Sequence, residues 1–308
     1  MNEFKENSII DAEEFTPTRQ AAAKKSTWIS VITNVSLTVV QLVTGFVTNS
    51  QGLLADGVHT LSDLVADFVV LLAIHHSQKE PDKKHHYGHK RYENAASLIL
   101  GVILLAVGFG MIWAAVQKLS LPETINTVNL TALWVAIGAL IAKELLFRYM
   151  LAVAERVRSS MLVANAWHAR SDAASSLVVA IGIGGNLLGY PLMDPIAALI
   201  VGFMVSKMGG VFCLDALHDL TDRAATDEEM TAIENDLRSV PGVLGLHDLR
   251  TRKTGDMLHV DVHLEVDGNL KISEGHDIAQ RAHKMALQNH PILTFMIHVD
   301  PIIKRNKK

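Results

Sequence analysis

Apolar blocks separated by short polar breaks make up about the first two-thirds of the chain. Each block reaches the length of about 20 residues that an α-helix needs to cross the hydrocarbon core of a membrane. We therefore predict six membrane-spanning helices, at Thr27–Val47, Leu53–Ile74, Ala95–Lys118, Val128–Tyr149, Met161–Leu188 and Pro195–Leu214. Ionisable residues interrupt the second and the fifth of these spans, so a hydropathy scan could miss either one.

From about residue 221 the pattern changes to charged and alternating positions, which are typical of a small α/β domain. Thr226 and Glu229 have the spacing of a capping box, which predicts a helix that continues to about Val240. Alternation and helical periodicity predict the remaining elements. These are strands at Leu246–Arg252 and Met257–Val266 with a turn at Gly255 and Asp256, a helix at Ser273–Asn289, and a last strand at Phe295–Val299 before Pro301. The order α-β-β-α-β favours a compact sheet with helices on one face.

The predicted fold is an α-helical membrane protein with six transmembrane helices followed by a small cytoplasmic α/β domain. Residues 1–25 are expected to form an N-terminal tail, residues 26–220 the transmembrane domain, and residues 221–308 the C-terminal domain. An even number of spans places both termini on one side of the membrane. Lysine and arginine gather before the first span, between the second and third, and between the fourth and fifth. Because cytoplasmic loops are enriched in these residues, we predict that both termini are cytoplasmic.

Composition agrees with a membrane protein and narrows the chemistry. At 49% hydrophobic residues, the chain of 308 residues is too apolar for an ordinary soluble protein. A net charge of −4 gives no reason to expect a nucleic-acid partner. Cys213 is the only cysteine, which excludes an internal disulfide and any cysteine-based zinc site. The N-terminus lacks the charged and apolar regions of a cleaved signal peptide.

Two His-x-x-x-Asp pairs lie inside predicted spans, His59 with Asp63 and His168 with Asp172. Their spacing places both side chains of a pair on one face of a helix, and ionisable residues at bilayer depth are costly. Two imidazoles and two carboxylates can supply the ligands of a tetrahedral divalent-metal site. A polar stripe that only joins helices by hydrogen bonds is the alternative, but the repetition of the unit on two spans favours the metal site. Asp67 lies one turn further along the same helix. Its role is either that of a proton or cation relay or that of a contact between helices.

The same ligands suggest how metal movement could be coupled to protons. A histidine binds metal only when it is neutral, and an unperturbed imidazole titrates at a pKa of about 6.5. Metal loading and protonation therefore exclude each other, which is the simplest route to an exchange of metal for protons.

These residues resemble the cation diffusion facilitator family over about Thr18–Pro301. The resemblance rests on LLADGVHTLSD in the second span, HHYGH in the following loop, HARSD in the fifth span, LTDRA at the domain junction, and HDLRTR with IHVDP in the tail. It implies a transporter that exports divalent metal cations from the cytoplasm in exchange for protons by alternating access. The resemblance further implies that the protein forms a homodimer and is not an enzyme. Zinc is the metal most expected, with ferrous iron, cadmium or cobalt as alternatives. The resemblance also implies a multi-pass protein of a bacterial inner (cell) membrane, in contact with lipid.

The family pattern implies further site residues outside the predicted spans. Asp82, His85 and His89 fall on positions that form a loop metal site, although a solvated charged loop is an equal alternative from the residues alone, and His86 is an additional candidate. In the tail, a metal site shared by the two domains of a dimer is implied at His247, His263, His276, His298 and Asp300. His259 lies outside this pattern, but it would add a ligand if it faced the same way as His263. Arg91 and Asp222 fall on the positions of a salt bridge that acts in hinge geometry.

Two other functions compete with transport. A membrane-anchored metal sensor or assembly partner would bind metal in its tail while the span residues only hold structure. An intramembrane metalloenzyme is the weakest hypothesis, because the sequence has no HExxH motif and no spare general base beside the two pairs.

Overall fold

The computed structural model describes residues 17–77, 79–121, 125, 127–156, 160–254 and 257–302. It separates into two compact units, Met1–Val69 with Leu100–Val211, and Val70–Ile99 with Phe212–Lys308. The long helices are α2 (Pro17–Thr48), α3 (Gln51–Ser77), α4 (Arg91–Ser120), α5 (Leu130–Arg156), α6 (Ser160–Leu187) and α7 (Met193–Leu220). The remaining elements are α8 (Asp227–Ser239), β1 (Gly245–Thr254), β2 (Met257–Asp267), α9 (Ile272–Asn289) and β3 (Ile292–Ile302).

The predicted spans fall on the helices α2 to α7, which have 27 to 32 residues each. Within the described residues, four segments are long and apolar enough to cross a membrane, namely Trp28–Thr48, Arg91–Ser120, Leu130–Arg156 and Met193–Leu220. The helices α3 and α6, which carry the His-x-x-x-Asp pairs, are not among these four. The helical membrane architecture is confirmed, while the number of six spans stays a prediction.

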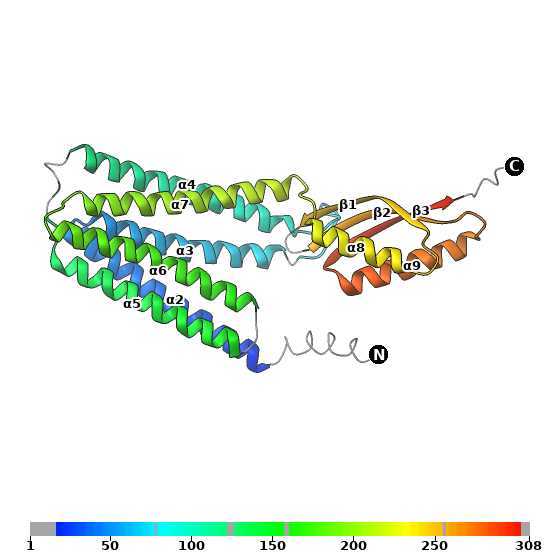
Figure 1. The fold of residues 1–308 in the computed structure, drawn as a ribbon, viewed down its shortest axis with the longest axis horizontal. Helices are drawn as coiled ribbons and strands as arrows, with labels where there is room; N and C mark the ends of the chain where they lie inside the picture. The colour runs from blue at the N-terminus through cyan, green and yellow to red at the C-terminus, as the bar shows by residue number, and fades with distance from the viewer. Residues whose placement is uncertain are drawn as a thin grey trace. The chain divides into compact units, whose positions relative to one another are not determined.

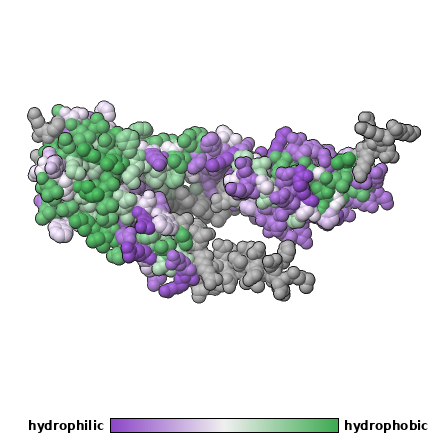
Figure 2. Space-filling model, in the orientation of Figure 1, coloured by the Kyte–Doolittle hydropathy of each residue, from purple (hydrophilic) through white to green (hydrophobic). Residues whose placement is uncertain are grey.

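Small residues allow close helix packing in the first unit. At Gly209 on α7, an added Cβ would lie 2.7 Å from the Leu105 nitrogen and 2.9 Å from the Gly101 oxygen on α4. Backbones that approach this closely tolerate only glycine, as is common where membrane helices meet. Large apolar side chains instead cover the outside of the bundle, where Phe46 is 78% exposed and Trp113 and Trp134 are each 67% exposed. Figure 2 shows this apolar surface in green, as expected for a lipid-facing protein.

The predicted capping box opens α8. Thr226 Oγ1 accepts a hydrogen bond from the Glu229 N–H at 3.2 Å, and Glu229 Oε2 accepts one from the Thr226 N–H at 2.8 Å. The backbone bond from Thr226 lowers the pKa of Glu229, so this carboxylate stays ionised and the cap is complete at neutral pH.

The sheet of the second unit has the order β1-β2-β3, with β1 and β2 antiparallel and β2 and β3 parallel. Alternate residues of β2, among them Val260 and Leu264, form one core with Ile233 and Leu237 of α8 and Ala282 of α9. Both helices therefore cover the same face of the sheet, as predicted (Figure 1). The opposite face carries the intervening β2 residues.

The last strand is longer than the sequence suggests. We expected it to end before Pro301, but β3 continues to Ile302 and Pro301 pairs with Val266. β3 is an edge strand, where a residue without a backbone N–H can be accommodated. The predicted turn at Gly255 and Asp256 lies outside the described residues.

Candidate metal sites

Three of the four predicted span ligands meet between α3 and α6. His59 Nδ1 lies 3.7 Å from Asp63 Oδ2, and His59 Nε2 lies 3.8 Å from Asp172 Oδ1. Their ligand atoms all lie within 4.8 Å of one another. Two ligands of one tetrahedral zinc ion stand roughly 3.3 Å apart, given metal–ligand bonds of about 2.0–2.1 Å. The observed separations are closer to that spacing than to a short hydrogen bond.

The burial of His59 supports a ligand role. This residue is only 5% exposed. Among the described residues, its Nδ1 atom is buried without a hydrogen-bond partner. A buried polar atom left in this way is costly unless something binds it, and a divalent cation between the imidazole and the carboxylates would do so.

His168 is the predicted ligand that the structure does not bring into this group. It lies one turn before Asp172 on α6, and its side chain is exposed. Within the described residues, the group consists of His59, Asp63 and Asp172. The side chain of Asp67 lies outside what the structure describes.

A buried charged network borders the group, and sequence reasoning missed it. Asp56 is fully buried and accepts hydrogen bonds from Lys143 Nζ at 3.1 Å, Ser175 Oγ at 2.8 Å and Ser176 Oγ at 2.6 Å. Gln41 of α2 also donates to it. The network therefore joins α2, α3, α5 and α6 around one carboxylate. Two features of the sequence indicate this network. Asp56 is a carboxylate one turn before His59, and Lys143 is a lysine inside an apolar block.

The network is also in direct contact with the metal group. Lys143 Nζ lies 3.4 Å from the backbone oxygen of Asp172, and Ser175 Oγ lies 2.7 Å from the same oxygen, so its single hydroxyl proton is shared between this oxygen and Asp56. Lys143 is 2% exposed. These bonds hold the α6 backbone at the residue whose carboxylate faces His59.

The loop after α3 forms a second group from Asp82, His85 and His89. Both imidazoles lie 3.5 Å from the Asp82 carboxylate. The backbone N–H groups of His85 and Lys84 donate to Asp82 Oδ1 and lower the pKa of this carboxyl group, which keeps it ionised. Gly88 closes the loop with a φ of 80°, a conformation that favours glycine. His86 is not a member of the group that the structure describes.

The register of the sheet assembles a third group. His263 pairs with His247 on β1 and with His298 on β3. All three imidazoles reach the Asp300 carboxylate, at 3.2 Å from His247, 2.8 Å from His263 and 3.3 Å from His298. The hydrogen bond from His263 lowers the pKa of Asp300, so the central carboxylate is ionised. Asp248, which sequence reasoning missed, joins His247 and His263 through an irregularity in β1.

Two other tail histidines lie apart from this group in the described part of the chain. His276 is exposed on α9, where its Nε2 lies 3.2 Å from Gln280 Nε2. His259 shares the face of β2 with His263, but it is 5% exposed and its Nδ1 is hydrogen bonded with Thr294. His276 is therefore the predicted tail ligand that stands alone.

The predicted pair of Arg91 and Asp222 is present. Arg91 Nη2 donates to Asp222 Oδ1, and both side chains are about half exposed, at 49% and 50%. Asp222 has a φ of 62° just after α7, where the Arg223 N–H bonds the His218 oxygen. This is the left-handed helix end of a Schellman motif, so the aspartate is held in a fixed position opposite the arginine.

Comparison with known proteins connects these features. Residues 27–221 match the cation efflux transmembrane domain, and residues 225–302 match the cytoplasmic domain of cation efflux proteins. An uncharacterized transporter of Methanocaldococcus jannaschii is 34% identical over 88% of this chain and 96% of its own. The manganese efflux system protein MneS of Bacillus subtilis is 31% identical over 89% of this chain and 94% of its own.

A longer relative and a solved domain also match. Metal tolerance protein C1 of Arabidopsis thaliana is 33% identical over 89% of this chain, which spans 61% of that protein. A solved MamM C-terminal domain has 19% identity and a TM-score of 0.25, and it covers 25% of this chain and 94% of its own.

Long apolar helices with clustered imidazoles and carboxylates, followed by a small α/β domain, define a multi-pass membrane transporter of metal cations. The chain belongs to the cation efflux family, also called the cation diffusion facilitators. This confirms the resemblance and places the protein among transporters.

The buried pair of Asp56 and Lys143 can be tested by a double-mutant cycle. Lys143→Met leaves an unpaired buried carboxylate and should lower the free energy of unfolding in mixed micelles by about 3–5 kcal/mol. Asp56→Asn with Lys143→Met should cost clearly less than the sum of the two single changes, because neither charge then remains alone. Additive effects would show that the two side chains do not interact.

Proposed function

We propose that the protein exports divalent metal cations from the cytoplasm in exchange for protons, through a site formed by His59, Asp63, His168 and Asp172. The observation that carries this proposal is the convergence of His59, Asp63 and Asp172 between two long helices of the bundle. Membership of the cation efflux family supports metal transport, and the ligand chemistry supports the finer assignment.

Zinc is the cation that the ligand set favours. Imidazole and carboxylate ligands in tetrahedral geometry suit zinc, and two carboxylates offset the charge of a divalent ion. The relative MneS is named for manganese efflux, so manganese belongs beside ferrous iron, cobalt and cadmium in any test. Carboxylate-rich sites suit manganese better than imidazole-rich ones.

The position of His168 suggests two states of the proposed transport cycle, one with this side chain near the other ligands and one with it apart from them. Its side chain is exposed one turn from Asp172, so a movement of α6 would bring it toward or away from the other ligands. In our proposal the metal binds when all four ligands meet, and protons replace it when the helices separate. Asp63 and Asp172 supply charge, and the imidazoles exchange metal for protons.

The same proposal includes a homodimer in a bacterial inner (cell) membrane, with both termini cytoplasmic. The match of residues 225–302 to a cytoplasmic domain supports this orientation. The distribution of lysine and arginine in the predicted loops supports it independently.

The group around Asp300 favours a second candidate function, metal sensing by the tail. Three imidazoles around one ionised carboxylate could bind a cation, and the binding energy would favour one arrangement of the tail over others. In this alternative the protein is a membrane-anchored sensor or assembly partner with little transport of its own.

Flux through proteoliposomes separates the two candidates. Asp63→Ala and Asp172→Ala should each reduce zinc-driven proton movement by more than about tenfold, since each removes a charged ligand. Glu144→Ala is the matched control, because Glu144 pairs with Arg148 on α5 and is not part of the metal group. Wild-type protein that binds zinc through its tail but moves neither zinc nor protons would support the sensor instead.

His59→Asp tests the assignment of metal preference. The substitution replaces an imidazole with a carboxylate, so the ranking of transport rates should move from zinc toward manganese. The measurement is uptake of zinc, ferrous iron, manganese, cobalt and cadmium into proteoliposomes by the variant and the wild type. An unchanged ranking would remove His59 as the residue that sets selectivity.

A further inference from the structure

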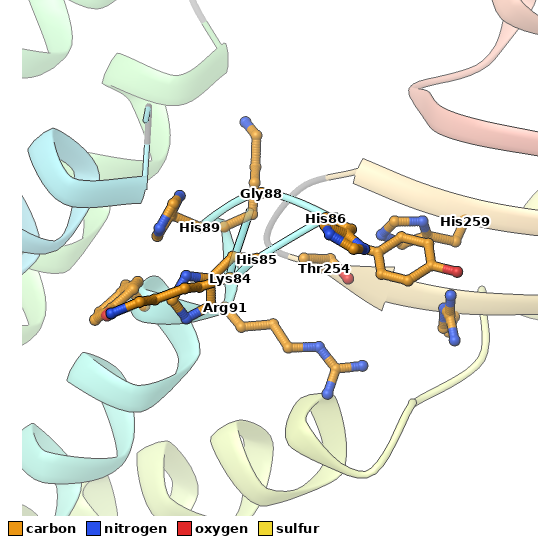
Figure 3. Close-up of a pocket in the computed structure, with 12 residues that line it drawn as sticks. Lys84, His85, His86, Gly88, His89, Arg91, Thr254 and His259 are labelled. Carbon is orange, nitrogen blue, oxygen red and sulfur yellow. The ribbon is translucent and has the colours of Figure 1, made fainter. Parts of the chain in front are cut away.

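A cavity of about 370 Å³ lies in the second unit, between the loop after α3 and the β1–β2 hairpin. Figure 3 shows His85, His89 and Arg91 on one side, and His86 of the same loop beside Thr254 and His259 on the other. Its lining carries four permanently positive side chains, Lys84, Lys90, Arg91 and Arg252. Within the described residues, no carboxylate lines it; His85 and His89 of the loop metal group are part of the lining, but Asp82 of that group is not.

Much of this positive charge has no partner. Arg91 is paired with Asp222. In contrast, Lys84, Lys90 and Arg252 form no ion pair in the part of the chain that the structure describes. The guanidinium carbon of Arg252 instead lies 5.6 Å from the centre of the Tyr87 ring, within the range of a cation–π contact.

His259 experiences this charge directly. It is only 5% exposed, and its Nδ1 is hydrogen bonded with Thr294, which leaves Nε2 as the ring nitrogen for a ligand. Burial lowers the pKa of His259, and the positive charges of Arg252 and Arg91 lower it further. Thr254, also in the lining, is 3% exposed, and its hydroxyl has no hydrogen-bond partner among the described residues.

We propose that this cavity binds an oxyanion of the phosphate class, either the phosphate of an anionic lipid headgroup or free inorganic phosphate. The planar guanidinium of Arg252 matches the geometry of phosphate oxygens, and the ammonium groups of Lys84 and Lys90 add charge. The volume exceeds that of a single phosphate, so a headgroup can enter. The positive charge disfavours a cation despite the nearby imidazoles.

The position of the cavity along the chain is compatible with either source of the phosphate group, a lipid headgroup or free phosphate. The lining residue Lys90 directly precedes α4 and Arg91 is its first residue, and this helix is long and apolar enough to span a membrane. Basic side chains beside a membrane helix attract anionic headgroups. A bound anion would also compete with Asp222 for Arg91, so occupancy of the cavity would weaken that ion pair.

The test uses the full chain with a chelator present, so that a metal cannot bridge protein and phosphate. One arm titrates inorganic phosphate into the detergent-solubilised protein by calorimetry. The other arm reconstitutes it in nanodiscs of phosphatidylcholine with or without phosphatidylglycerol and counts retained lipids by native mass spectrometry. Binding in the first arm identifies free phosphate, and binding in the second arm alone identifies the lipid.

Arg252→Gln should weaken whichever binding is found by about tenfold, as expected for the loss of a charge-assisted hydrogen bond. The control is Arg250→Gln, on the same strand but 78% exposed, outside the lining and near Asp248. Lys90→Gln serves as a second variant if Arg252→Gln does not fold. Equal binding by the cavity variants and the wild type, equal loss in the control, or no binding in either arm would overturn the proposal.

Discussion

Charged side chains inside a membrane bundle must find partners there, and this requirement shapes the transmembrane unit. Asp56 is satisfied by Lys143, two serines and a glutamine from three other helices. One turn along α3, His59 has an unpartnered buried nitrogen among the described residues and faces two carboxylates. A fully bonded carboxylate therefore holds the helices together, while Nδ1 of the neighbouring His59 is left without a hydrogen bond among the described residues. Because Lys143 and Ser175 also bond the Asp172 backbone, the structural network fixes one side of the metal group.

In the tail, the register of the β-strands brings ionisable side chains together. Pairing of His263 with both His247 and His298 places three imidazoles side by side across the sheet around Asp300. On the same face of the sheet, His259 lines the basic cavity, whereas the three imidazoles surround a carboxylate. One face of a three-stranded sheet thus carries a group suited to cations and a cavity suited to anions, while the other face packs against α8 and α9.

Sequence reasoning succeeded where local pattern determines structure. Apolar blocks gave the long helices, and the Thr226–Glu229 spacing gave the start of α8. It selected His59, Asp63 and Asp172, which lie close together, from spacing on one helix and repetition on another, and their role as ligands stays a prediction. It missed the pair of Asp56 and Lys143, which are 87 residues apart and meet only through helix packing. The rotation of α6, which leaves His168 exposed, is likewise a tertiary property. The extension of β3 past Pro301 depends on its edge position in the sheet.

X-ray absorption at the zinc edge tests most directly whether the span residues bind the metal. The loop and tail groups would first be disabled with His85→Ala and Asp300→Asn in the full-length protein. We expect bound zinc with four nitrogen or oxygen ligands at about 2.0–2.1 Å, including imidazole, and loss of this signal after Asp172→Ala. Zinc that is absent before that change, or that keeps the same ligand shell after it, would contradict a metal site at His59, Asp63 and Asp172.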